Sequence, residues 1–298
     1  MAKQLNIIEA PLCTGVGLQG VEFMAGALRE AGLQEAVGAV TWDAISEPVK
    51  ATVVDPVTSL PEPELVRDFL LQLADHVEKV CNQEDIPLVV GGDCTILLGC
   101  LAGAKRRGKM GMLFVDGHTD FHKPGGGKTE PASMELYFAT GRGPEVLSKL
   151  GGDAPLVRDR DVVCFGYQNG DRPYTGGADP KTVLSPADTD MLCLPLDRIR
   201  KRGFGNAVDT ALKHLCADDR DFWLHVDVDV LDDREMPAVD YRLPDGLSVG
   251  ETVETIRRAM KTDKVRGINL TIFNPTLDWD GSRASLLVEL LGTALKNK

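Results

Sequence analysis

The chain has 298 residues, of which 43% are hydrophobic, and a formal net charge of −12. Its length suits one large α/β domain or two small ones, and because no linker-like segment or fixed-period repeat divides it, we expect a single domain over residues 1–298. The acidic balance argues against nucleic-acid and anionic-membrane partners, and no stretch approaches the roughly 18–20 apolar residues of a membrane span.

The first half of the chain alternates between apolar runs and amphipathic stretches. We expect strands at 5–10, 36–43, 86–90 and 111–115. We expect helices at 23–31, 64–82 and 95–106, and another that begins within 133–141. Gly32 closes the first of these helices as its C-cap.

The second half repeats the alternation. Strands are expected at 161–166, within 187–194, at 222–230 and at 265–273, and helices at 208–215, 249–261 and 283–296. Strands that alternate with helices form right-handed crossovers and a mainly parallel sheet covered on both faces. In such sheets ligands bind beyond the carboxyl ends of the strands.

Aspartate and histidine residues, which can ligate metals, follow directly after the expected strand at 111–115. Asp116, His118, Asp120 and His122 occupy every second position, and in an extended backbone alternate side chains share one face. Clustered buried carboxylates are costly unless a cation lies between them. Taken alone, this stretch fits either a metal site or a solvated polar strand end.

Two further stretches favour the metal site. The run His-Val-Asp-Val-Asp places His225, Asp227 and Asp229 at alternate positions of another strand. The run Val-Val-Gly-Gly-Asp-Cys-Thr at 89–95 ends an apolar strand in a Gly-Gly turn before a helix start, and it offers Cys94 as one more ligand. Together they predict a carboxylate-rich site for one or two metal ions.

These stretches resemble the ureohydrolase family of arginases, agmatinases and formiminoglutamases. That family carries Gly-Gly-Asp-His-Ser, Asp-Ala-His-x-Asp and Ser-x-Asp-x-Asp-x-x-Asp-Pro. Here the matching segments are Gly-Gly-Asp-Cys-Thr at 91–95, Asp-Gly-His-Thr-Asp at 116–120 and His-Val-Asp-Val-Asp-Val-Leu-Asp-Asp at 225–233. The resemblance covers nearly the whole chain. It implies a three-layer αβα sandwich around a mainly parallel eight-stranded sheet, an arginase/deacetylase-like fold.

The resemblance also implies a site with two manganese ions bridged by carboxylates and a hydroxide. Carried over by position, one ion takes Asp116, His118, Asp227 and Asp229. The other takes Asp116, Asp120, Asp227 and position 94, where Cys94 replaces the family's histidine. Asp120 would hold and orient the hydroxide, so Asp120 and His118 are the catalytic candidates. A small-molecule substrate is implied.

Cys94 changes what this second position can bind. Manganese prefers oxygen and imidazole ligands, whereas a thiolate favours zinc or iron. The alternatives for the Cys94 side are therefore weak binding of an ion, binding of a different metal such as Zn²⁺ or Fe²⁺, or no ion, so the centre holds one or two ions. His225 shares a face with Asp227 and is either a substitute ligand or a hydrogen-bonded core histidine.

Two more positions depart from the family pattern. Ile272 stands where the family commonly has a glutamate that pairs with the guanidinium, and an apolar group cannot offset the desolvation of that cation. Ala132 falls where the family often has a proton-shuttling histidine. Glu135 is either a replacement shuttle or a helix-capping or exposed residue.

Two residues are candidates for substrate binding. His122, with Lys123 beside it, matches a position that contacts the substrate carboxylate in arginases; the alternative is a solvated loop. Asp171 matches a position that recognises an α-amino group; the alternative is a turn-forming aspartate before Arg-Pro.

The first functional hypothesis is a metal-dependent hydrolase of a linear amidine or guanidino C–N bond, with a substrate less basic than arginine. The alternatives are a deacetylase-like amidohydrolase with one zinc ion on Asp116, His118 and Asp227, and a non-catalytic relative used for binding. Seven scattered cysteines and an N-terminus without an apolar signal core predict a cytoplasmic protein. The resemblance further implies a homo-oligomer, a trimer or hexamer.

Overall fold

The computed structural model describes residues 3–14, 19–46, 49–51, 53–125, 127, 129–152, 155–168 and 184–296. Its centre is an eight-stranded sheet in the order β3-β1-β5-β10-β9-β6-β7-β8. The strands are β1 (Leu5–Glu9), β3 (Thr41–Ala44), β5 (Ile86–Val90), β6 (Gly111–Val115), β7 (Val162–Phe165), β8 (Leu192–Leu194), β9 (Phe222–Asp227) and β10 (Val265–Thr271). A two-stranded sheet pairs β2 (Leu12–Cys13) with β4 (Val49–Lys50).

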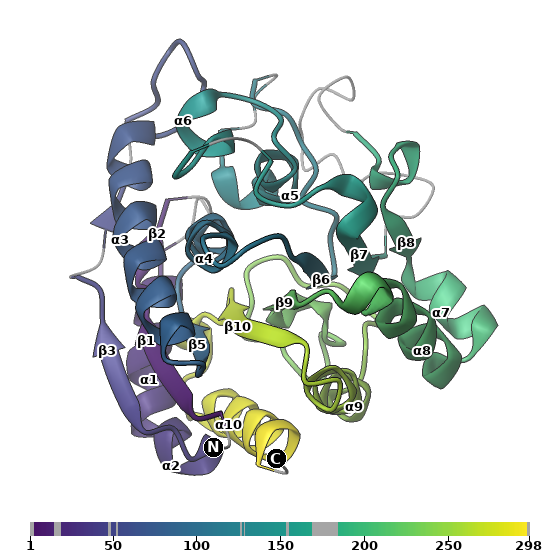
Figure 1. Ribbon diagram of the computed structural model, residues 1–298. Coiled ribbons are helices and arrows are strands. Elements are labelled where there is room, and N and C mark those ends of the chain that lie inside the picture. The colour runs from purple at the N-terminus through teal and green to yellow at the C-terminus, as the bar shows by residue number, and fades with distance from the viewer. Residues whose placement is uncertain are drawn as a thin grey trace.

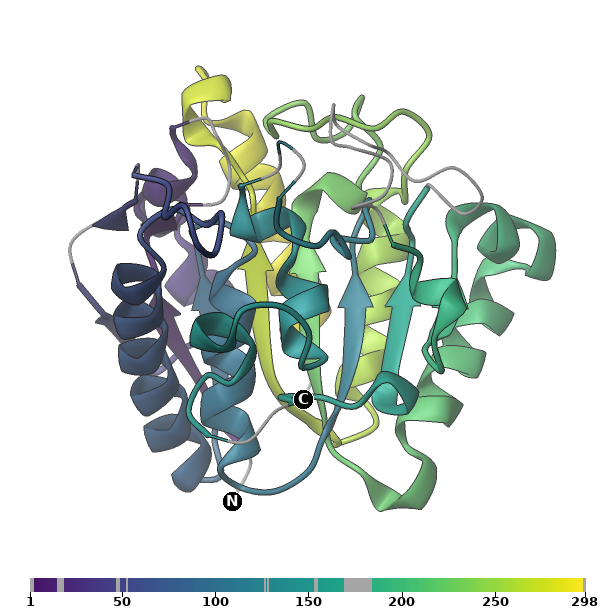
Figure 2. The same ribbon diagram turned by 90° about the horizontal axis from the view of Figure 1, so that it is seen from above.

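All seven pairings in the large sheet are parallel. The arrows of the central strands accordingly point the same way in Figure 2. Parallel neighbours end at the same edge of a sheet, so the residues that follow β5, β10, β9 and β6 meet there.

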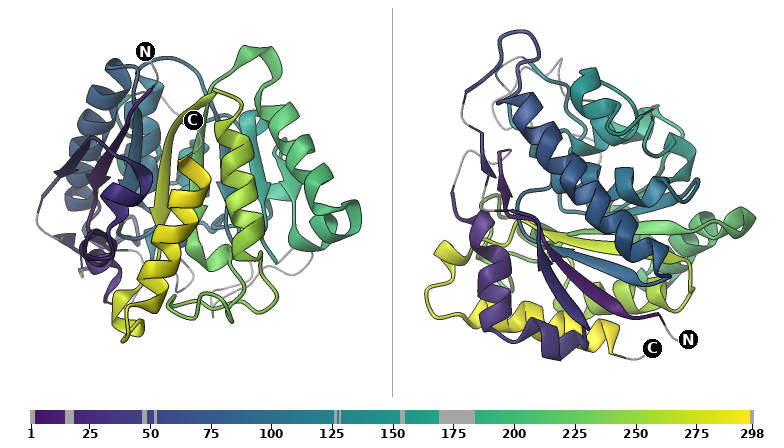
Figure 3. Two further views of the ribbon diagram at one scale, coloured as in Figure 1. Left: turned by 90° about the horizontal axis from the view of Figure 1, so that it is seen from below. Right: turned by 60° about the vertical axis from the view of Figure 1, so that its left-hand side comes forward.

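Helices cover both faces of the sheet (Figure 1). One face carries α3 (Pro63–Asn82), α4 (Ile96–Lys105), α5 (Glu135–Ala139) and α6 (Glu145–Ser148). The other carries α1 (Met24–Glu30), α2 (Leu33–Val37), α7 (Leu196–Arg202), α8 (Phe204–Leu215), α9 (Val249–Met260) and α10 (Ser282–Leu295). Figure 3 shows α9 and α10 side by side on this second face. The predicted three-layer αβα sandwich is confirmed.

Each face of the sheet has its own hydrophobic core, and successive strand residues pack alternately into one core and the other. In β5, Leu88 and Val90 belong to the core under α1, α9 and α10, while Val89 belongs to the core under α3 and α4. Among the described residues, no helix is both long and apolar enough to cross a bilayer.

Helix α4 is buried along nearly its whole length because two glycines let α3 approach it closely. A Cβ on Gly99 would lie 2.8 Å from the carbonyl oxygen of Leu70, and one on Gly103 would lie 2.4 Å from that of Ala74. Both separations are too short for any larger side chain. This contact holds α4, and the Cys94 that precedes it, against the sheet.

Some expected elements were wrong in part. The expected strand at 36–43 is divided: α2 continues to Val37, Gly38 ends it with φ 68°, and β3 begins only at Thr41. Strand β9 stops at Asp227, because Val228–Val230 forms a 3₁₀ turn. Helix α7 was not expected.

Candidate metal centre

The candidate ligands lie at the carboxyl ends of the four central strands. Cys94 follows β5, Asp116 follows β6, and Asp227 ends β9 opposite Thr271, the last residue of β10. A Gly-Gly turn makes room for the first of these segments, since a Cβ on Gly92 (φ 71°) would lie 2.6 Å from the carbonyl oxygen of Ala10.

Asp93 anchors the same turn. Its carboxylate accepts hydrogen bonds from the backbone N–H groups of Thr14 (2.7 Å) and Thr95 (2.9 Å), and it is fully buried. These bonds set where the next residue, Cys94, enters the site. The motif therefore contributes one positioning carboxylate and one ligand candidate.

The first group of ligand atoms comes from Asp116, His118 and Asp229, which offer atoms within 4.8 Å of one another. His118 Nδ1 lies 2.9 Å from Asp229 Oδ2, and the backbone N–H of His118 donates to Asp116 Oδ1 at 2.6 Å. The backbone N–H of Asp229 donates to Asp227 Oδ1 at 2.8 Å. One imidazole and several carboxylates thus face one small volume.

The physical reason for this convergence differs from the expected one. Residues 116–122 lie beyond the end of β6, Asp120 has φ 39°, and Asp229 lies in the 3₁₀ turn after β9. Alternate side chains on one face of an extended strand are therefore not what brings them together. Tight turns at neighbouring strand ends do so instead.

The second group shares Asp116 and adds Cys94, Glu135 and His225, all buried, with ligand atoms again within 4.8 Å. Cys94 Sγ lies 2.6 Å from Asp227 Oδ2 and 3.2 Å from Thr271 Oγ1. Asp116 therefore stands between an oxygen- and imidazole-rich half and a thiol-containing half, which is the arrangement of a bridging ligand.

The carboxyl groups of this centre are unfavourably charged without a cation. Burial, reinforced by the charges of neighbouring aspartates, raises the pKa of Asp116 and of Asp227 well above the ordinary value. Burial also raises the pKa of Glu135, and the charges of Asp120 and Asp116 raise it further.

Several buried polar atoms here have no hydrogen-bond partner among the described residues: Asp116 Oδ2, both carboxyl oxygens of Glu135 and Nε2 of His225. Unpaired buried carboxylate oxygens cost free energy unless a proton or a cation satisfies them. The residues at this centre therefore fit a divalent cation, with hard ligands around His118 and a softer one at Cys94.

The cysteine sets a condition on that fit. Burial and the charge of Asp227 raise the pKa of the Cys94 thiol well above its ordinary value. A thiol must lose its proton to ligate a metal, and a bound cation supplies the charge that makes this favourable. Cys94 can therefore be a ligand only together with a cation that binds thiolate strongly.

The structure decides between the alternatives left open for two residues, and His225 is a hydrogen-bonded core histidine. Glu135 is fully buried in the first turn of α5, so neither surface exposure nor helix capping describes it. It is the one charged residue in the run Met-Glu-Leu-Tyr-Phe-Ala, and a lone charge in an apolar helix is the available sign of a buried role. His225 is also fully buried; burial lowers its pKa to about 4, so it is neutral at neutral pH.

The structure tests only part of the predictions for substrate binding. His122 is only 7% exposed, so the solvated-loop interpretation is wrong for it, while its contact with a substrate stays a prediction. Asp171 lies outside the described residues. Ile272 is 4% exposed and adopts φ 74°, a left-handed conformation that β-branched residues rarely take, and its N–H donates to the carbonyl of Gly92 at 3.2 Å.

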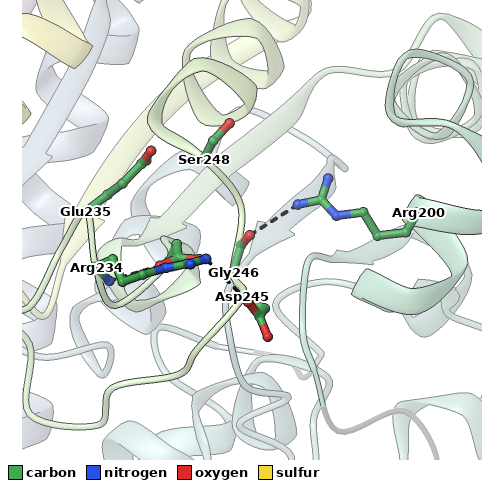
Figure 4. A pocket seen from close by; sticks show the side chains of 7 residues that line it. Arg200, Arg234, Glu235, Asp245, Gly246 and Ser248 are labelled. Atoms are coloured by element: carbon green, nitrogen blue, oxygen red, sulfur yellow. Dashed lines mark hydrogen bonds and ion pairs between the residues drawn. The ribbon is translucent and has the colours of Figure 1, made fainter.

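A separate pocket of about 450 Å³ opens beside the loop that follows β9 (Figure 4). None of the candidate metal ligands lines it. Arg200 donates to the carbonyl of Gly246 at 3.1 Å and pairs with Glu251, while Arg234 pairs with Asp232. Both arginines of this pocket therefore already have carboxylate partners.

Comparison with known proteins agrees with this geometry. The family model described as "Arginase family" matches residues 3–296. The arginase of Bacillus subtilis is 27% identical over 309 aligned residues, covering 100% of this chain and 99% of that protein.

The fold is likewise that of solved structures. Arginase from Bacillus caldovelox superposes with a TM-score of 0.88 at 23% identity, covering 100% of this chain and 99% of that one. Formimidoylglutamase from Bacillus subtilis has a TM-score of 0.76 at 17% identity, covering 99% and 87%. Members of the matched family are metal-dependent hydrolases of C–N bonds. The resemblance of the motifs to ureohydrolases is therefore confirmed, and this chain belongs to the arginase family.

Proposed function

We propose that the protein hydrolyses a linear amidine or guanidino C–N bond of a small molecule and that its centre holds Mn²⁺ near His118. The observation that carries the proposal is the position of Asp116, whose carboxylate is shared by the His118–Asp229 group and the Cys94–Glu135 group. Asp116, His118, Asp227 and Asp229 would hold the manganese ion. Cys94 would bring Zn²⁺ or Fe²⁺ to the other half, if a second ion binds.

A bound divalent cation lowers the pKa of water and so supplies a nucleophile at neutral pH. Asp120 would orient that nucleophile toward the substrate carbon. Glu135 is suited to move the proton that the leaving amine needs, because its raised pKa lets a carboxyl oxygen hold a proton at neutral pH. It would replace the histidine that relatives use for this step.

The substrate class follows from Ile272. The buried isoleucine offers no charge to a guanidinium, so a formimino group, a hydroxyguanidine or another less basic amidine is favoured over arginine. His122 and, by position, Asp171 would bind polar groups at the far end of the substrate.

The test combines metal analysis with a substrate screen. We expect manganese-loaded protein to release urea, ammonia or an amide from at least one guanidino or formimino compound, and the Asp116→Asn variant to lose this activity. Zinc alone with hydrolysis of acetylated amines would replace the proposal with a deacetylase-like one. No turnover with manganese, zinc or iron would leave a non-catalytic, binding role.

We further propose a cytoplasmic homo-oligomer, a trimer or hexamer. The seven free cysteines support a reducing compartment, because oxidised compartments favour disulfides. Light scattering coupled to size-exclusion chromatography tests the assembly, and a purely monomeric mass would refute it.

A further inference from the structure

A hydrogen-bonded chain of three buried side chains leads into the centre. Trp223 and His225 lie on β9, and Asn269 lies on the neighbouring strand β10, directly opposite His225. Trp223 Nε1 donates to Asn269 Oδ1 at 2.7 Å, and Asn269 Nδ2 lies 2.8 Å from His225 Nδ1. All three side chains are fully buried.

The indole of Trp223 decides the orientation of the Asn269 amide and therefore the direction of its hydrogen bond with His225. An indole N–H can only donate, so the oxygen of Asn269 must face Trp223. The amide nitrogen of Asn269 then faces His225 and donates to Nδ1. The reversed amide would set the N–H of Trp223 against the NH₂ of Asn269 and leave buried donors unsatisfied, at a cost of about 1–3 kcal/mol for each such group.

A histidine whose Nδ1 accepts a hydrogen bond is neutral and carries its proton on Nε2. Nε2 is the nitrogen that faces the centre, 3.8 Å from Asp116 Oδ2. The ring is also stacked on Phe114, with centroids 4.7 Å apart, so it cannot rotate freely. A protonated ring nitrogen has no lone pair for a metal.

We propose that His225 presents a protonated Nε2 to Asp116 and is not a metal ligand, and that Trp223 fixes this state through Asn269. Nε2 lies 3.8 Å from Asp116 Oδ2, beyond hydrogen-bond distance, and both atoms lack a hydrogen-bond partner among the described residues. A cation beside Cys94 would then be held by sulfur and by carboxylate oxygens, from Cys94, Asp116 and Asp227, without the imidazole that lies within reach. The tautomer of His225 does not depend on the proposed function. Only the statement that His225 does not ligate a cation rests on the proposed function.

The tautomer can be observed directly in metal-free protein. Long-range ¹H–¹⁵N correlation spectra of protein labelled with ¹⁵N-histidine distinguish protonated from unprotonated ring nitrogens. We expect the His225 resonances, assigned with the His225→Gln variant, to show a proton on Nε2 and none on Nδ1. The opposite tautomer would overturn the proposal. This measurement involves no catalysis, so its failure is distinct from failure of the proposed function.

The Asn269→Asp substitution tests the role of these three side chains, because it reverses the direction of the hydrogen bond between residue 269 and His225. A carboxylate only accepts, so it would accept from Trp223 and also from Nδ1–H of His225, which frees Nε2 to bind a metal. With zinc as the probe, we expect the variant to bind at least about tenfold more tightly than the native protein, and the His225 ring nitrogens to shift on zinc addition only in the variant.

The matched control is Asn269→Asp combined with His225→Gln, which we expect to lose the added zinc affinity. A shift of the His225 ring nitrogens to metal-bound values in native protein on zinc addition would refute the proposal. If the Asn269 variants fail to fold, the spectra of the native protein with and without zinc still decide the question.

Discussion

At the scale of single residues, this protein differs from the family motif mainly by exchanging one ligand type for another. A thiol stands at position 94, and an isoleucine stands at position 272 where a carboxylate would meet a guanidinium. Sequence motifs located these residues, because each lies at a fixed offset from a Gly-Gly or Asn-Pro turn. They named Glu135 and His225 but could not decide the roles of these residues, because the roles depend on contacts between segments far apart in the chain.

Restoring the family ligand is expected to change the metal preference. A Cys94→His substitution replaces a soft ligand with an imidazole, which suits manganese better. We expect the manganese affinity of the half of the centre that contains position 94, measured by calorimetry on metal-stripped protein, to rise at least about tenfold, or 1.4 kcal/mol. Cys94→Ser serves as the control, since it removes the thiol without adding a nitrogen. Equal manganese affinities for all three proteins would show that position 94 does not contact the ion.

Ile272→Glu is expected to open the site to guanidinium substrates. The added carboxylate can pair with the cation, so we expect kcat/KM for arginine or agmatine, measured by urea release, to rise at least about tenfold relative to Ile272→Gln. The glutamine variant has nearly the same shape and no charge. If the two variants behave alike, the charge at position 272 does not select the substrate.

At the scale of secondary structure, the buried strands could be predicted well and the edge elements poorly. The bounds of β5 and β6 were predicted to the residue, because both strands are continuous apolar runs ended by Gly-Gly or by an aspartate. The predicted start of edge strand β3 was too early in the sequence, because Ala36 and Val37 belong to α2 although they continue the apolar run of the strand. Hydrophobicity alone does not distinguish the end of a helix from the start of a strand.

The packing between β9 and β10 depends on a glycine. Gly267 lies opposite Trp223, and a Cβ there would come within 2.1 Å of the indole ring and 2.9 Å of Pro87 Cγ. We expect Gly267→Ala to lower the free energy of unfolding, measured with urea, by roughly 1–3 kcal/mol because the core is overpacked. The displaced indole would also disturb the hydrogen bond to Asn269.

Gly26→Ala in α1 is the matched control, since a Cβ there would meet no atom within 4 Å. In a helix this change is expected to stabilise the fold by up to about 1 kcal/mol. Similar effects of the two substitutions would mean that the contact between Gly267 and Trp223 is not what constrains this position.

At the scale of the whole molecule, the sheet order joins the two halves of the chain. Strand β10, near the end of the sequence, lies between β5 and β9, so the centre is complete only when the last strand has docked. This interleaving supports the prediction of a single domain over residues 1–298. It also makes the stability of the fold depend on how the charges at the centre are neutralised.

Metal binding is therefore expected to stabilise the protein more as pH rises. Asp116, Glu135 and Asp227 have raised pKa values, so the folded metal-free chain holds protons that the unfolded chain has released. From ordinary carboxyl values near 4 upward, its free energy of unfolding thus falls with pH until these groups ionise. A bound cation takes the place of those protons.

Calorimetric melting curves between about pH 5 and pH 8 would measure this effect. Free cation at 100 times its Kd contributes about 2.7 kcal/mol, which corresponds to a rise in Tm of roughly 4 °C for a chain of 298 residues. We expect the rise in Tm caused by a fixed manganese concentration to become larger as pH increases. For the Asp116→Asn variant we expect this increase with pH to be smaller. A rise independent of pH would show that the buried carboxyl groups are not the groups that respond to the ion.

The close contact between α3 and α4 has a consequence for the lifetime of the protein. A reactive cysteine in an active site is commonly lost to peroxide, which oxidises it beyond repair. Here α4 seals Cys94 against the sheet with 1% of its surface exposed, whereas Cys216 is the most accessible of the seven thiols. The low exposure and raised pKa of Cys94 therefore protect the thiol at the centre from oxidation for as long as the two helices stay together.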